Sequence, residues 1–143
     1  METAGGFVYV IKQLELALRP RFLEACATEG MTGAQYTVLT VLQRRPGITS
    51  SELARRSLVR PQTMAGTIDA LLGAGLVRRE DDPAHARRKL LFLTPAGSEA
   101  VDRVSVPVRE LEELLVGDLT PEEREQFFDY LRRSRNALGA AGR

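Results

Sequence analysis

The 143-residue sequence has little cysteine and no long apolar run. Its single cysteine, Cys26, cannot form an internal disulfide, which favours a reducing, cytoplasmic compartment. No apolar run approaches the roughly 20 residues that a transmembrane helix needs. The first residues also lack the basic segment followed by an apolar block that marks a secretory signal. We therefore expect a cytoplasmic protein without a membrane segment.

Residues that form catalytic and metal sites are equally scarce. The single histidine, His85, lies far from Cys26 in the sequence, and the two form no recognisable set of metal ligands. There is no glycine-rich phosphate loop, no pairing of a nucleophile with a histidine base, and no distinctive pair of carboxylates. We therefore expect no enzyme activity, no metal and no cofactor, and we interpret Cys26 as a buried, inert thiol.

Positive charge, in contrast, is concentrated in the middle of the chain. The formal net charge of the whole protein is only +1. Residues 44–89 nevertheless contain ten Lys and Arg against five Asp and Glu, whereas the segments on either side are slightly acidic. A localised basic segment suits a partner with a phosphate backbone, because each neutralised phosphate releases counterions.

The positions of threonine and glycine mark the ends of helices. Thr32, Thr49 and Thr120 are each followed three residues later by Gln or Glu, which is the spacing of a capping box. Glycines stand where the preceding helices should end, at Gly30, Gly47, Gly75 and Gly117. With the apolar periodicity, these signals predict a mainly α fold with a small β-hairpin. The expected helices span 7–28, 33–44, 50–57, 61–72, 95–116 and 121–138, and the expected strands 76–80 and 89–93.

Residues 49–73 are predicted to form a helix-turn-helix and residues 76–94 a β-hairpin wing, within one domain over 1–143. Apolar residues fill the inner face of the two short helices, at Leu53, Ala54, Leu58, Met64, Ile68, Leu71 and Leu72. The residues left on the outer side near the start of the second helix are Pro61, Gln62, Thr63, Gly66 and Thr67. This arrangement is typical of proteins that hold duplex DNA.

The exposed side chains of this segment suit two kinds of DNA contact. Gln62 can make a bidentate contact with adenine, and the Thr63 methyl group can touch a thymine methyl group. Phosphate contacts, which set register without reading sequence, suit Ser50, Ser51, Arg55 and Arg60. The alternative is that the two serines only cap a helix and that Arg55 is only solvated.

The predicted wing carries Arg87 and Arg88 after a turn at Asp82-Pro83. An exposed arginine at a wing tip can enter the narrow minor groove, where the negative potential is deepest. The alternative is a charged, solvated loop that keeps a strand edge from aggregating. We favour the groove for Arg87, because the helix pair upstream would aim the wing at the same duplex, with Arg88 on the backbone.

The terminal segments 6–29 and 95–138 have apolar stripes longer than a small core can cover. They predict a helical dimer interface built from both ends of the chain, and a two-fold protein would match paired DNA half-sites. The alternative is that these helices pack on each other within one subunit.

Three stretches carry a family resemblance: MTGAQYTVLTVL, SSELARRSLVRPQTMAGTIDALLGAGLVRRE and DDPAHARRKLLFLTPAGSEA. Together they resemble the MarR family of winged-helix transcriptional regulators. The resemblance implies a homodimer that binds a pseudo-palindromic operator in double-stranded DNA, with recognition helices in major grooves and wings in minor grooves. It implies repression and, as in many members, release of DNA by a small, often aromatic or phenolic, effector. Candidate effector contacts are Val10, Ile11 and Leu14, with core or dimer interface as the alternative for these residues.

The chain departs from the family pattern at three positions. His85 stands where the wing usually has an aspartate that orients the arginine, Ala86 replaces a frequent arginine, and Gly66 replaces a larger residue. A neutral imidazole can accept a hydrogen bond from a guanidinium, but a doubly protonated one cannot, so acid would weaken the support of Arg87. The alternative is an exposed His85 without function. A competing hypothesis for the whole chain is a winged-helix protein-interaction module without specific DNA binding.

Overall fold

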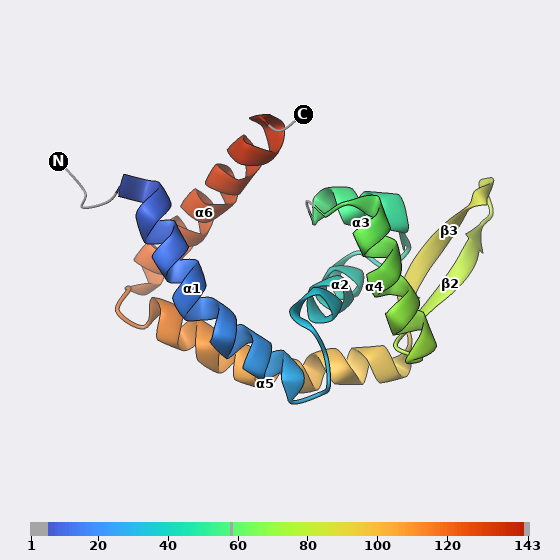
Figure 1. Cartoon of the computed structure of the whole chain (residues 1–143), viewed down its shortest axis with the longest axis horizontal. Helices are drawn as coiled ribbons and strands as arrows, with labels where there is room; N and C mark the ends of the chain where they lie inside the picture. The colour runs from blue at the N-terminus through green and yellow to red at the C-terminus, as the bar shows by residue number, and fades with distance from the viewer. Residues whose placement is uncertain (1–5, 58, 142–143) are drawn as a thin grey trace. The chain divides into compact units, whose positions relative to one another are not determined.

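The computed structural model describes residues 6–57 and 59–141 (Figure 1). The elements follow in the order α1 (Gly6–Ala27), α2 (Gly33–Arg44), β1 (Ile48–Thr49), α3 (Ser50–Arg56), α4 (Pro61–Gly73), β2 (Val77–Asp82), β3 (His85–Leu93), α5 (Pro95–Val116) and α6 (Pro121–Ala141). The mainly α fold class is confirmed. The chain divides into two compact units, Met1–Val108 and Arg109–Arg143, with the boundary inside α5. A single domain over 1–143 therefore stays a prediction.

The helix boundaries are set by the caps that the sequence predicts. At the start of α2, Thr32 Oγ1 accepts a hydrogen bond from Gln35 N at 3.1 Å, and Gln35 Oε1 accepts one from Thr32 N at 3.0 Å. Thr120 and Glu123 form the same reciprocal pair before α6. At α3, Thr49 Oγ1 accepts from Glu52 N at 3.2 Å. Each cap satisfies backbone donors that a helix end leaves unpaired.

The sheet is larger than predicted. It has three antiparallel strands in the order β1-β3-β2, and β1 pairs Ile48 with Leu91 and Thr49 with Leu90. The prediction missed β1 because a strand of two residues is too short to show an alternating pattern. The predicted strands 76–80 and 89–93 are also too short, since β2 continues to Asp82 and β3 begins at His85. In Figure 1 this hairpin extends beyond α4.

One apolar cluster holds the short helices against the sheet. Its fully buried members include Leu39 of α2, Leu53 of α3, Leu71 of α4, Leu91 of β3 and Val104 of α5. Ala54, Met64 and Ile68 are buried as predicted and Leu72 is partly buried against the cluster, whereas Leu58 lies outside the described residues. The orientation of α3 and α4 relative to the hairpin is therefore set by side-chain packing.

The start of α5 lies against the loop before β2, and Gly97 makes this close approach feasible. Thr94 N donates a hydrogen bond to Leu76 O at 3.1 Å, and Thr94 Oγ1 accepts one from Gly97 N at 3.1 Å. A Cβ atom placed on Gly97 would lie only 2.0 Å from Leu76 O. Because the obstacle is backbone, a small side-chain movement cannot relieve the clash.

We expect Gly97→Ala to lower the free energy of unfolding by about 3 kcal/mol, at the upper end of the usual cost of overpacking. Urea unfolding followed by circular dichroism measures this change. Gly73→Ala in α4 is the matched control, because a Cβ there would meet nothing within 4 Å. Equal stability of the two variants would contradict the close approach of α5 to Leu76.

Every large apolar side chain that the described part of the chain leaves exposed lies on α1, α5 or α6. The most exposed are Phe7 at 81%, Leu138 at 76%, Val8 at 74% and Phe128 at 70%. The uncovered apolar surface expected for the terminal helices is thus present on α1 and, separately, on α6. None of the helices within residues 6–57 and 59–141 is long and apolar enough to cross a membrane.

Candidate nucleic-acid interface

The first turns of α4 present an exposed polar face. Arg60 is the N-cap residue and Pro61 occupies the first helical position, where a missing N–H is harmless. The side chains turned to solvent are those of Arg60, Pro61, Gln62 and Thr63, and Gly66 is exposed with them. The opposite face is buried through Met64, Ile68 and Leu71. The predicted division of α4 into a core face and an outer face is confirmed, and contact of the outer face with DNA stays a prediction.

Gly66 leaves the backbone of α4 uncovered on this outer face. A Cβ at this position would meet nothing within 4 Å, so packing within the chain does not require a glycine here. A larger residue would fit here, so the glycine changes the surface that α4 presents rather than its packing. A backbone this accessible allows a close approach to another molecule.

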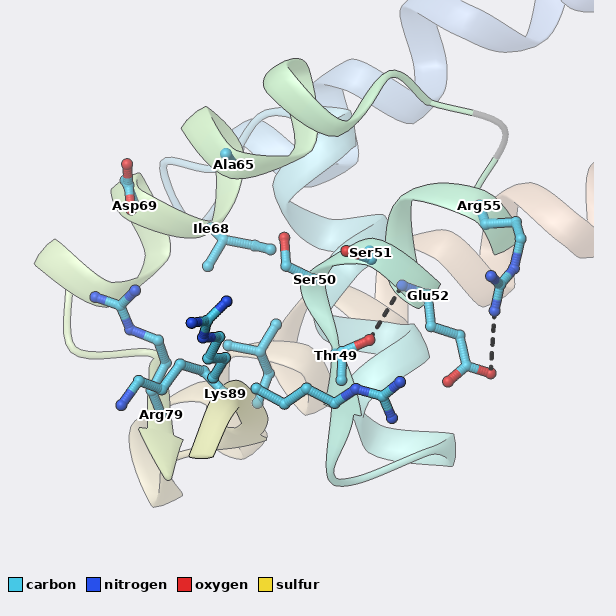
Figure 2. Close-up of a pocket in the computed structure, with 13 residues that line it drawn as sticks. Thr49, Ser50, Ser51, Glu52, Arg55, Ala65, Ile68, Asp69, Arg79 and Lys89 are labelled. Atoms are coloured by element: carbon cyan, nitrogen blue, oxygen red, sulfur yellow. Dashed lines mark hydrogen bonds and ion pairs between the residues drawn. The ribbon is translucent and has the colours of Figure 1, made fainter. Parts of the chain in front are cut away.

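A cleft of about 470 Å³ lies between the helix pair α3–α4 and the strands β2 and β3 (Figure 2). Five of its lining residues were predicted as DNA contacts: Ser50, Ser51, Arg55, Arg87 and Arg88. The remaining lining residues are Thr49, Glu52, Ala65, Ile68, Asp69, Arg79, Lys89 and Leu91. The cleft thus joins the predicted phosphate contacts of α3 to the predicted wing contacts. The exposed residues at the start of α4 are not part of its lining.

Arg79 and Lys89 belong to this site although the sequence analysis did not select them. Figure 2 shows both residues at the strand side of the cleft. Arg79 is the register partner of Leu91, and Lys89 precedes Leu91 by two residues in β3. Register partners and alternate residues share a face of a sheet, so both lie on the face of the buried Leu91. If the strand register had been known, the alternation of side chains on either side of Leu91 would have placed both residues on this face.

The ion pairs of the wing leave three guanidinium groups without a carboxylate partner. Arg78 pairs with Glu80, and Lys89 pairs with Asp81. The hydrogen bond and positive charge of Lys89 hold the pKa of Asp81 below its ordinary value. Among residues 6–57 and 59–141, Arg79, Arg87 and Arg88 form no ion pair. All three side chains line the cleft. These fixed charges are available to an anion from outside the chain.

The predicted position of Arg87 in a loop at the wing tip is wrong. The hairpin turns at Pro83-Ala84, where Asp82 Oδ1 accepts a hydrogen bond from Ala84 N at 2.9 Å, and β3 begins at His85. Asp82 pairs with His85 but Asp81 pairs with Lys89, so residues 86–88 bulge from the ladder without register partners. A bulge redirects side chains, and it explains why Arg87 and Arg88 line the cleft behind the tip.

The predictions made for α1 have different outcomes. Cys26 is fully buried, as predicted, and its burial raises the pKa of the thiol, which keeps it in the unreactive protonated form. Val10 and Ile11 are exposed and Leu14 is half-buried. Contact of these three residues with an effector stays a prediction. In the part of the chain that the structure describes, no group of three metal-ligating side chains is assembled.

Comparison with known proteins gives consistent relatives. A model described as "MarR family" matches residues 29–88, which include α2, α3, α4 and most of the wing. The transcriptional regulator HosA of Escherichia coli O111:H- is 33% identical over 108 residues, covering 75% of this chain and 79% of that protein. The solved repressor CouR, bound to a 23-mer DNA duplex, is 26% identical with a TM-score of 0.82, covering 94% of this chain and 99% of that one. PcaV of Streptomyces coelicolor, solved with its natural ligand, is 27% identical with a TM-score of 0.82, covering 96% and 97%.

Proposed function

Because this chain belongs to the MarR family, we propose that it is a homodimeric transcriptional regulator that binds a pseudo-palindromic operator in double-stranded DNA. The observation that carries the proposal is the cleft, which Arg79, Arg87 and Arg88, unpaired among the described residues, line together with Ser50 and Ser51. Guanidinium and hydroxyl groups are the usual partners of backbone phosphates. The relative CouR, solved on a DNA duplex, supports the same reading.

In this proposal the exposed face of α4 reads base edges in the major groove. Gln62 contacts adenine, Thr63 contacts a thymine methyl group, and Pro61 and Gly66 allow the helix to approach the bases closely. The backbone contacts come from Ser50, Ser51, Arg55, Arg60 and Arg88, to which we add Arg79 and Lys89. Arg87 turns from the cleft into the adjacent minor groove, since no carboxylate of the described residues pairs with it.

The dimer is proposed to form through the terminal helices. The apolar side chains exposed on α1, α5 and α6, such as Phe7, Phe128 and Leu138, would lose their contact with water in such an interface. A two-fold dimer presents two copies of α4 to half-sites about one helical turn, or about 34 Å, apart.

We further propose that DNA binding represses transcription and that a small aromatic or phenolic effector releases it. The relative PcaV has been solved with its natural ligand, which supports control by a bound effector without indicating its chemistry. An effector shifts the equilibrium only if it binds one spacing of the two DNA-binding regions better than the other. Val10, Ile11 and Leu14 of α1 are its proposed contacts. We propose no catalytic role, and we propose that the protein acts in the cytoplasm, where it would meet chromosomal DNA.

The alternative function is a winged-helix module that binds another protein and no specific DNA. It gives no role to the unpaired guanidinium groups of the cleft, and the relative bound to a duplex argues against it. Selection from a pool of random duplexes distinguishes the two functions. We expect an enriched inverted repeat with half-sites about one helical turn apart. A pool without any enriched sequence would favour the protein-interaction module.

We expect Gln62→Ala to weaken operator binding by about 1–3 kcal/mol per half-site and to relax the preference at a single base pair. Affinity is lost because the adenine edge no longer has a hydrogen-bond partner on the protein. Competition with duplexes substituted at each base pair measures both effects. Gln43→Ala, at an exposed position of α2, is the control. A uniform loss across all sequences would show that Gln62 contacts the backbone instead.

A further inference from the structure

The outermost part of the wing carries an imidazole and no guanidinium. The hairpin turns at Pro83-Ala84, and His85 is the exposed first residue of β3. The bulge over residues 86–88 directs Arg87 and Arg88 to the cleft behind the tip. His85 is the only histidine of the chain. The tip itself can therefore gain a positive charge only through this side chain.

The acidic residues next to the tip differ in their partners. Glu80 pairs with Arg78 and Asp81 pairs with Lys89, so their charges are neutralised within the wing. Asp82 has no ion pair among the described residues, and its Oδ1 accepts only the hydrogen bond from Ala84 N. Asp82 is also the register partner of His85. With a neutral imidazole, the charge of Asp82 is therefore not neutralised by any ion pair of the described residues, and it repels DNA phosphates.

We propose that His85 is a DNA contact of the wing and that its protonation strengthens operator binding. This inference rests on the proposed DNA-binding function. A protonated imidazole neutralises Asp82 and donates from both ring nitrogens, and a narrow minor groove attracts inserted histidine as it does arginine. The protonated His85 adds a cation at the tip of the wing, whereas the neutral His85 leaves Asp82 to repel the duplex.

The proposed pH dependence of DNA binding is opposite to the one expected from the sequence. That expectation required a neutral His85 to hold Arg87 by a hydrogen bond, and the described structure contains no bond between these two residues. The charged group opposite His85 in the ladder is Asp82, and Arg87 follows two residues later within the bulge of β3. DNA adds phosphates to this environment, which favours the charged imidazole. Binding is then coupled to proton uptake, so affinity increases as the pH falls.

Because His85 is the only histidine, its imidazole NMR signal can be followed without assignment. We expect its titration midpoint to rise on addition of the selected operator duplex, and a rise of one pH unit corresponds to a tenfold affinity gain per wing. Fluorescence anisotropy of the same duplex at fixed ionic strength, from pH 8.5 to pH 5.5, should show the matching increase in affinity. An unchanged midpoint in the complex would overturn the proposal.

Three variants separate His85 from other titrating groups. His85→Gln should bind with the wild-type affinity of pH 8.5 at every pH, and His85→Arg should bind tightly at every pH. Asp82→Asn keeps an acceptor for Ala84 N and should tighten binding at pH 8.5, where the repulsion is greatest. A His85→Gln protein with the wild-type pH dependence would overturn the assignment. If the wild type binds no duplex at any pH, the proposed function itself fails; binding that does not vary with pH refutes only the role of His85.

Discussion

Arg87→Ala is expected to weaken operator binding by roughly 30- to 1000-fold, which corresponds to about 1–2 kcal/mol for each of two wings. Arg87 lines the cleft, and no carboxylate pairs with it in the described part of the chain. Its charge is therefore not used inside the protein, and removing it should affect the complex far more than the fold. The measurement is anisotropy of a labelled operator, with unfolding in urea to verify stability.

The control for this prediction is Arg133→Ala on α6, which removes the same charge from an exposed residue outside the wing and the helix-turn-helix. The control should bind the operator as the wild type does. If both variants weaken operator binding equally, Arg87 contributes only through the net charge of the protein and not through a specific contact. If Arg87→Ala binds normally, Arg87 does not contact the duplex.

Phe128→Glu is expected to dissociate the dimer and, with it, to abolish specific DNA binding. Phe128 is 70% exposed on α6, and the proposed interface would bury it. Burying a carboxylate without a partner costs several kcal/mol, and a cost of about 3 kcal/mol already weakens self-association at least ~100-fold. Sedimentation at micromolar concentration should show a monomer, and anisotropy should show only weak binding that is insensitive to sequence.

Gln126→Glu places the same charge on the same helix at an exposed polar position and should leave the dimer intact. A wild-type protein that is already monomeric would contradict the proposed assembly. If Phe128→Glu remains a dimer, the dimer interface does not include this face of α6.

Much of the fold follows from local signals in the sequence. The reciprocal bonds at Thr32 and Thr120 start α2 and α6 where their capping boxes predict. Positive φ values at Gly30, Gly47 and Gly75 end the preceding segments at the predicted positions. These features depend on residues only a few positions apart, and for that reason sequence alone reveals them.

The parts of the site that sequence reasoning missed depend on contacts between distant residues. Strand β1 exists only because Ile48 and Thr49 pair with Leu91 and Leu90 of β3. The bulge that places Arg87 in the cleft follows from the register of β2 on β3. Arg79 and Lys89 join the site by the same register. A run of charged, exposed residues shows no apolar alternation, so their strands cannot be recognised locally.

In the proposed complex, two copies of this chain hold duplex DNA through the cleft arginines and the exposed face of α4. The salt dependence of binding is the decisive measurement of this arrangement. The affinity for the selected operator should be measured between 50 and 200 mM salt, with the stoichiometry at each step. We expect two chains per duplex and an affinity that falls by roughly 10³-fold or more across this range, as for about six phosphate contacts. Binding by a single chain, or an affinity independent of salt, would contradict the account.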